Sequence, residues 1–188
     1  MKIVVNPLGR QINEYLMRMA LPLGLLFIVE YLISCAALHH MMLGLLVWPL
    51  KLCVPVALWW VIRRIRQIYL CNAIPGFTAW TFGTQLMFFA GLLEAMFIYV
   101  YNEFLRPGNL AAVQQGMIEQ YQNVYNELQQ LGMYKESLPT LQQMIDKMKE
   151  APVSSAIETA ISTLSSDIFV GMLLMIPIAL IVRRKPNL

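Results

Sequence analysis

The sequence predicts an all-α membrane protein, a bundle of four transmembrane helices with an extracytoplasmic amphipathic helical hairpin between the third and the fourth. Three observations lead to this fold class: an apolar composition, four long apolar stretches and one polar insert. Hydrophobic residues make up 58% of the 188 residues, charged residues make up 13%, and the mean hydropathy is +0.57. Because a soluble domain carries about 25% charged residues, this composition argues against a soluble enzyme, a disordered chain and a disulfide scaffold.

The four apolar stretches are each long enough to cross a membrane. A helix of about 20 mostly apolar residues spans the ~30 Å hydrocarbon core of a bilayer. The stretches cover residues 17–38, 41–62, 80–101 and 164–182 of a single membrane domain. Each is expected to be helical, because backbone groups cannot stay unpaired in lipid. Since only the turn at His39 and His40 separates the first two, these two are expected to form an antiparallel pair.

The basic residues predict the orientation in the membrane. They cluster before the first stretch, after the second and after the fourth, whereas most acidic residues lie in the insert. Since Lys and Arg are in excess in cytoplasmic segments, both termini are expected in the cytoplasm and the protein in an inner (cytoplasmic) membrane. A net charge of +3 gives no reason to expect a nucleic-acid partner. We interpret the clusters as anchors to anionic membrane lipids: Arg63, Arg64, Arg66, Arg183, Arg184 and Lys185.

The insert, residues 102–155, is expected to hold two amphipathic helices. In the first, apolar residues recur with spacings of 4, 4, 3, 4 and 3 and so share one helix face: Val113, Met117, Tyr121, Val124, Leu128 and Leu131. Gly132 is expected to end this helix, and Ser155 with Glu158 predicts a capping box at the start of the last one. We expect the apolar faces to pack on each other and on the ends of the spans. The alternatives are a partner-binding face and a helix lying on the lipid surface.

Four charged residues lie within the apolar stretches: Glu30, Lys51, Glu94 and Asp167. A charge at the centre of a bilayer costs about 2.5–3.5 kcal/mol, so each needs a partner or water. Glu30 and Lys51 lie at similar distances along the chain from the turn that joins their helices, so we predict an ion pair between them. Glu94 and Asp167 are expected to join the same polar interior. The cluster is interpreted either as a proton, cation or lipid-headgroup site, or as a pair that fixes helix registry.

No pattern in the chain points to catalysis. The sequence contains no G-x-S-x-G, H-E-x-x-H, P-loop or G-x-G-x-x-G motif. Its three cysteines form no C-x-x-C pair, and the adjacent side chains of His39 and His40 diverge on a helix. We therefore expect a non-enzymatic protein with no metal and no cofactor.

The third stretch and its exit resemble a known family. Phe77-Thr78-Ala79-Trp80, then Gly83, then the run Ile98-Tyr99-Val100-Tyr101-Asn102-Glu103-Phe104-Leu105-Arg106-Pro107 are similar to the core of a bacterial membrane family of unknown function, the domain-of-unknown-function family four-one-nine-nine. The resemblance covers nearly the whole chain and implies four spans with a polar helical insert. It also implies a membrane partner, because genes of this family often lie beside a gene for a polyprenyl-phosphate glycosyltransferase. Lys51 is not part of the family pattern.

Taken together, these features favour an accessory or scaffold subunit that docks another membrane protein, such as a polyprenyl-phosphate glycosyltransferase. The small residues of the third stretch, Gly83 and Gly91 among them, offer a surface for a foreign helix. The alternative is a small transporter or ion pathway that uses the intramembrane charges. An ion path through only four spans would require a homo-oligomer. Transporters usually contain internal repeats, and none is found between the first two spans and the last two. A membrane enzyme ranks third.

Overall fold

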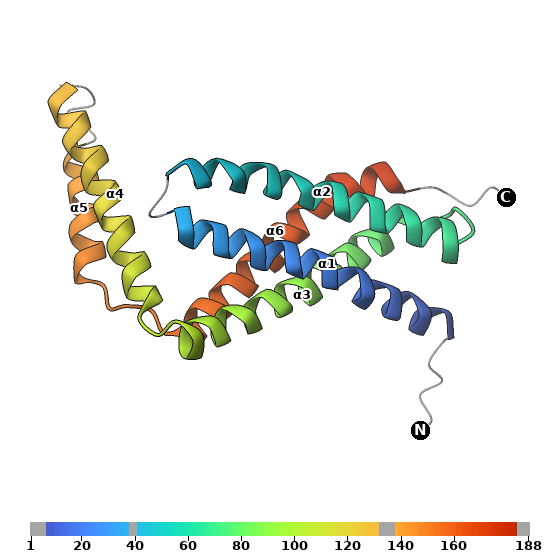
Figure 1. Cartoon of the computed structure of the whole chain (residues 1–188). Helices are drawn as coiled ribbons and strands as arrows, with labels where there is room; N and C mark the ends of the chain where they lie inside the picture. Colours follow the sequence, from blue (N-terminus) through green and yellow to red (C-terminus); the bar gives the residue numbers. More distant parts are fainter. Residues whose placement is uncertain (1–6, 38–40, 132–137, 184–188) are drawn as a thin grey trace.

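The computed structural model describes residues 7–37, 41–131 and 138–183, and within these ranges it is all-helical. The described residues form six α-helices and one π-helical turn, and the α-helices are labelled in Figure 1. The elements are α1 (Pro7–Ala37), α2 (Met41–Tyr69), α3 (Gly76–Val100), η1 (Tyr101–Leu105), α4 (Asn109–Leu131), α5 (Leu138–Glu150) and α6 (Ala156–Val182). The predicted all-α fold class is confirmed.

Four of these helices are long and apolar enough to cross a membrane, namely α1, α2, α3 and α6, with η1 continuing the span of α3. They coincide with the four predicted stretches, but all extend beyond them. Polar residues outside the apolar stretches continue the helices without a break, as Arg63 and Arg64 do in α2. The prolines within α1, α2 and α6 do not interrupt them either. We call the end of the bundle near the two chain termini the terminus end, and the opposite end the insert end.

The spans form two helix pairs that cross. α1 packs against α2, α3 packs along α6, and α1 also contacts α3. Figure 1 shows that α2 and α6 lie close together at the terminus end and diverge toward the insert end. At the terminus end, the buried Arg66 side chain donates a hydrogen bond of 2.7 Å from Nη1 to the carbonyl oxygen of Val182. This contact ties α2 to the last turn of α6.

The apolar core fills the terminus half of the bundle. It contains large side chains with no measurable exposure: Leu16, Leu58, Ile62, Ile65, Ile74, Leu86 and Met175. The Trp80 indole adds a polar link, because Nε1 donates a hydrogen bond of 3.0 Å to the carbonyl oxygen of Met172. The terminus half is therefore closed by close packing.

Glycines set the contact between α3 and α6. Gly83 faces the Met175 side chain, and a Cβ atom at Gly171 would lie 2.6 Å from Cγ of Met87. The small residues of the third span are thus occupied by α6 within the same chain. The expectation that this side is free for a foreign helix is wrong, because the fourth span fills it.

The insert consists of α4 and α5, which lie side by side across the ends of the spans (Figure 1). Gln114 joins them, because Nε2 donates hydrogen bonds of 2.9 Å and 3.0 Å to the carbonyl oxygens of Met148 and Ala151. The capping box at Ser155 and Glu158 is present, with hydrogen bonds of 2.9 Å and 3.3 Å. The predicted helix end at Gly132 and the predicted turn at His39 and His40 lie outside the described residues.

Candidate functional site

A cavity of about 390 Å³ lies between α2 and α6, with α1 and α3 behind it. We call it the polar cleft. Its apolar wall includes Phe27, Val54, Met87 and Leu174, and its polar lining contains all four predicted intramembrane charges: Glu30, Lys51, Glu94 and Asp167, together with Ser166. Polar groups thus converge inside an apolar wall, which is the usual composition of a binding site.

The predicted ion pair between α1 and α2 is present. Nζ of Lys51 lies 3.4 Å from Oε1 of Glu30. The Lys51 side chain is 61% exposed, whereas the Glu30 side chain is 18% exposed. The ammonium group therefore lies at the edge of the polar cleft, where an incoming group can reach it.

Glu94 and Asp167 form the second part of the cluster. Glu94 on α3 is only 7% exposed and lines the polar cleft together with Asp167 on α6. Gly91 allows Asp167 to approach α3, because a Cβ atom there would lie 3.2 Å from Oδ2 of Asp167. That oxygen is buried and accepts no hydrogen bond from the described residues. A buried acceptor without a donor is costly, so the site is suited to an additional donor.

The charges in the polar cleft are unequal. Among the described residues that line it there are three carboxyl groups, on Glu30, Glu94 and Asp167, and one ammonium group, on Lys51. In an apolar environment, unpaired charge of one sign is strongly unfavourable. A cationic group that enters the cleft would relieve this imbalance, as would a proton bound by one of the carboxyl groups.

A second cavity, of about 760 Å³, lies between the insert and the spans, next to the polar cleft. We call it the vestibule. It is lined by α1 and α2 at Ser34, Gly44 and Val47, and by α4 at Gln120, Val124 and Glu127. Trp48 and Lys51 line both cavities, so the two cavities meet at these side chains. The charge cluster is therefore reached from the insert end, whereas the apolar core closes the terminus end.

The predicted basic anchors separate into two groups. Arg63 and Arg64 are exposed, and their guanidinium carbons lie 5.1 Å and 5.6 Å above the rings of Trp59 and Trp60. Arg183 is exposed just after α6, whereas Arg184 and Lys185 lie outside the described residues.

Arg66 differs from these anchors, because it is only 8% exposed and hydrogen-bonds to α6. Its interpretation as a lipid anchor is wrong. The packing of α6 against the last turns of α2 covers its side chain.

The predicted apolar face of α4 remains largely uncovered. Met117, Tyr121, Val124 and Leu131 are 41%, 42%, 47% and 66% exposed, whereas Val113 and Leu128 are half-buried. The expectation that this face packs on α5 and the ends of the spans is therefore wrong for most of its length. The helix turns a different side, marked by Gln114, toward α5.

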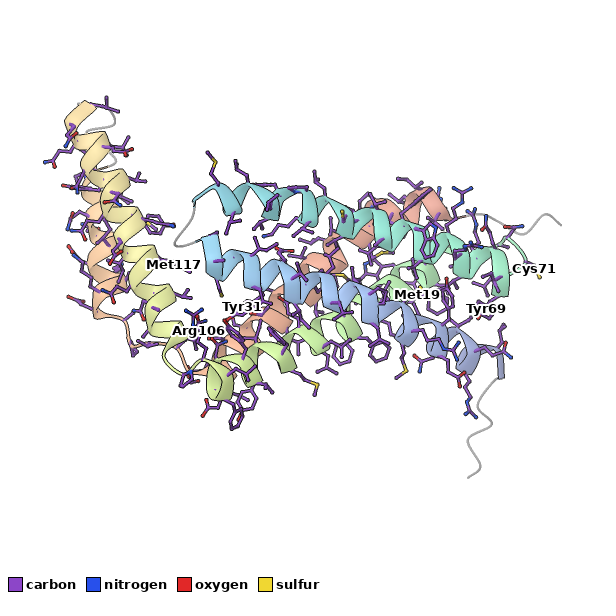
Figure 2. The ribbon with its side chains drawn as sticks, in the orientation of Figure 1. Met19, Tyr31, Tyr69, Cys71, Arg106 and Met117 are labelled. Atoms are coloured by element: carbon purple, nitrogen blue, oxygen red, sulfur yellow. The ribbon has the colours of Figure 1, made fainter. Side chains whose placement is uncertain are left out.

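The sequence analysis did not identify a polar network at the insert end. Asn102 Nδ2 donates a hydrogen bond of 2.8 Å to the hydroxyl of Tyr31, and Asn109 Nδ2 donates one of 2.9 Å to Oδ1 of Asn102. Asn109 also contacts Sγ of Cys35 at 3.9 Å. In Figure 2, Tyr31 and Arg106 are labelled at this corner, where α3 passes into α4. In the sequence, Asn102 within the aromatic-rich end of the third span could have indicated this network, because a buried amide needs hydrogen-bond partners.

Comparison with known proteins identifies the family. The family described as "Protein of unknown function (DUF4199)" matches residues 18–184. No curated protein and no solved structure matches the chain. The match covers most of the first span, the other three spans and the whole insert, and it agrees with the resemblance noted at Phe77–Trp80 and in the aromatic exit of α3. The chain therefore belongs to the DUF4199 family.

Proposed function

We propose that this protein is a non-enzymatic accessory subunit that docks another membrane protein, and that the polar cleft is the docking site. The observation that supports this proposal is the uneven charge of the cleft between two helices that diverge. The cavity of about 390 Å³ between α2 and α6 can accept a long side chain of a foreign helix that packs beside it. That side chain would bring the missing cation.

The charges specify the kind of partner helix. Oδ2 of Asp167 is buried and accepts no hydrogen bond within the described part of the chain, and Glu94 lines the same cleft. A Lys or Arg within a transmembrane helix needs such acidic partners, because a single charge in the bilayer is costly. We therefore propose that the partner carries one basic residue at the depth of Asp167. An enzyme that acts on polyprenyl phosphate, a glycosyltransferase, is the partner class that the family resemblance suggests.

The orientation is part of this proposal. We place both termini in the cytoplasm of a bacterial inner membrane, with α4 and α5 on the opposite side. The exposed Arg63, Arg64 and Arg183 at the terminus end support this orientation, because cytoplasmic ends of spans carry Lys and Arg. A reporter that is active only in the cytoplasm, fused to the C-terminus, should be active. Activity of an external reporter at that position would contradict the orientation.

The docking site can be tested by photo-crosslinking in native host membranes. A photoreactive amino acid at position 170 would lie at the cleft, because Val170 lines it. The same amino acid at position 176 provides the control, because Ile176 is exposed on α6 but does not line the cleft. We expect a crosslinked membrane protein at position 170 and none at position 176. Substitution of Glu94 by Gln should abolish the crosslink.

Two results would contradict the docking proposal. One is a protein that purifies alone in every mild detergent and gives no crosslink at position 170. The other is a crosslink that is equally strong at positions 170 and 176, because that pattern describes random contact in the membrane. The exposed Glu119→Gln variant serves as the charge-matched control and should keep the crosslink.

The connection between the vestibule and the polar cleft favours a second candidate function, an ion or proton pathway. Together these cavities lead from α4 to Glu94 and Asp167, and the apolar core closes the other side. This arrangement would correspond to an access path that is open on one side only. Cation- or proton-dependent flux into vesicles that contain the purified protein, abolished by Glu94→Gln, would favour this candidate over the docking subunit. Purified protein that produces no flux would eliminate it.

A further inference from the structure

We propose that α4 is an interfacial membrane helix, whose apolar stripe is immersed in the headgroup and upper acyl layer of the bilayer at the insert end. The apolar stripe is the face defined by Val113, Met117, Tyr121, Val124, Leu128 and Leu131. This inference concerns the insert alone and does not depend on the docking partner.

The start of α4 is fixed to the bundle. Asn109, its first residue, is only 6% exposed and is bonded to Asn102, which in turn holds Tyr31 of α1. Just before it, Gly108 has a φ of +88°, a conformation that glycine adopts without strain. The π-helical turn η1 and these buried amides set the direction in which α4 leaves α3. The helix is therefore oriented by the bundle.

That direction carries α4 across the ends of the spans. In Figure 1, α4 and α5 run across the axes of α1 and α2 and extend past α2 at their far ends. The last turn of α4 therefore lies beyond the cross-section of the bundle, whereas Val124 still lines the vestibule next to the ends of α1 and α2. In a membrane, the space beside the ends of the spans is filled by lipid.

The three sides of α4 have different neighbours. Gln114 marks the side that packs on α5, and Gln120 with Glu127 marks the polar side that lines the vestibule. The stripe lies between these two sides. Figure 2 shows Met117 on the side of α4 nearer the ends of α1 and α2. The polar side chains thus face the vestibule together with Val124 at the edge of the stripe. The rest of the stripe faces the lipid next to it.

Exposed apolar side chains also lie at the end of the span that leads into α4. Phe104 and Leu105 in η1 are each 67% exposed at the end of the third span. After the exposed Arg106, the half-buried Leu110 and Val113 follow, and then the exposed Met117. A helix with one apolar and one polar face beside the end of a span is typical of a helix in the membrane interface.

The charges of α4 determine which lipids it needs. The helix contains no Lys or Arg and two acidic residues, Glu119 and Glu127. Attraction to anionic lipid therefore cannot hold it at the membrane, and burial of the stripe has to supply the free energy. We expect the same immersion in neutral phosphatidylcholine as in bilayers that contain phosphatidylglycerol.

Spin-label accessibility in vesicles tests the inference on the full-length protein. Cys35, Cys53 and Cys71 are first replaced by serine. Single cysteines are then placed on the stripe, at positions 117, 121 and 131, or on the opposite side of α4, at positions 119 and 126. In phosphatidylcholine vesicles we expect labels on the stripe to be reached by oxygen and protected from an aqueous nickel complex, with the reverse at positions 119 and 126. The immersion depth should be ~5–10 Å.

Three outcomes would overturn the inference. If all positions are equally open to the nickel complex, α4 stands in water. If the stripe is closed to both reagents, protein covers it, either this bundle or a second copy of the chain. Immersion that occurs only with phosphatidylglycerol would show that charge, rather than the apolar stripe, holds the helix. Circular dichroism of each variant should match that of the serine-substituted parent, and a variant that fails this check is replaced by one at the next position of the same face.

Discussion

Helix α6 packs against two neighbours in different ways. Against α3, small residues allow close contact along the length of both helices, as at Gly83 and Gly171. Against α2, it makes contact at the terminus end through Arg66 and separates toward the insert end, where the polar cleft lies. We call the close contact between α3 and α6 the seam. Helix α6 thus forms the seam with α3 and the polar cleft with α2.

The difference follows from side-chain size and charge. A membrane offers no hydrophobic gain for helix association, so close van der Waals contact between small residues holds α3 and α6 together. In the cleft, Trp48 and Lys51 on α2 are large, and the carboxyl groups they face are incompletely paired. Stability is therefore expected to depend on the seam, and function on the cleft.

The strongest test of the seam is Gly171→Leu. The new side chain would overlap Met87, which is almost fully buried and has little space to move. Overpacking of this kind costs about 3 kcal/mol at the upper end of its usual range. We expect a clear drop in the thermal unfolding midpoint in mild detergent. Gly9→Leu is the control, because a Cβ atom there would meet nothing within 4 Å. Equal stability of the two variants would contradict the account of the seam.

Arg66→Met tests the closed end of the cleft. The variant removes the hydrogen bond from the buried guanidinium to the Val182 carbonyl. Hydrogen bonds to charged groups contribute about 1.5–3 kcal/mol, so we expect a loss of about 2 kcal/mol in unfolding experiments. Arg63→Met, at an exposed position, should change little. A smaller loss in the free energy of unfolding for Arg66→Met than for Arg63→Met would show that Arg66 does not hold α2 to α6.

The ion pair at the open end is expected to contribute less. Lys51 is largely exposed, so Lys51→Met or Glu30→Gln alone should cost about 1–2 kcal/mol, between the values for surface and buried pairs. The double variant should cost less than the sum of the two single changes, because the groups are in contact. A thermodynamic cycle from unfolding of all four proteins measures this coupling. If the double variant leaves both stability and crosslinking at position 170 intact, the pair neither sets registry nor forms part of the site.

The smallest effect is expected on the lipid-facing side of α2. Leu45 is 66% exposed and lines neither cavity. Its replacement by Ala should change the free energy of unfolding by less than ~0.5 kcal/mol, as is usual for surface positions. Unfolding in detergent checks this value. A loss comparable to that of Gly171→Leu would mean that α2 has a partner on this side, such as a second copy of the chain.

Much of the fold could be predicted from local patterns. The four apolar stretches identified the spans, and Ser155 with Glu158 identified the start of α6, because hydropathy and capping act over a few neighbouring residues. The Glu30–Lys51 pair was also predictable, because a short turn places both residues at a common depth. The exposure of the α4 stripe was not predictable, because the same amphipathic pattern fits a face buried on protein and a face on lipid.

The sequence by itself determined the number of spans, the helical insert and the identity of the intramembrane charges. Only the tertiary structure decided that α6 fills the small-residue side of α3, that Arg66 is buried, and that α2 and α6 part to leave a cavity around Glu94 and Asp167. The physical reason is the range of the forces involved. Hydropathy and helix propensity act along the chain, whereas close packing and charge pairing depend on crossing positions that residues far apart in sequence set together.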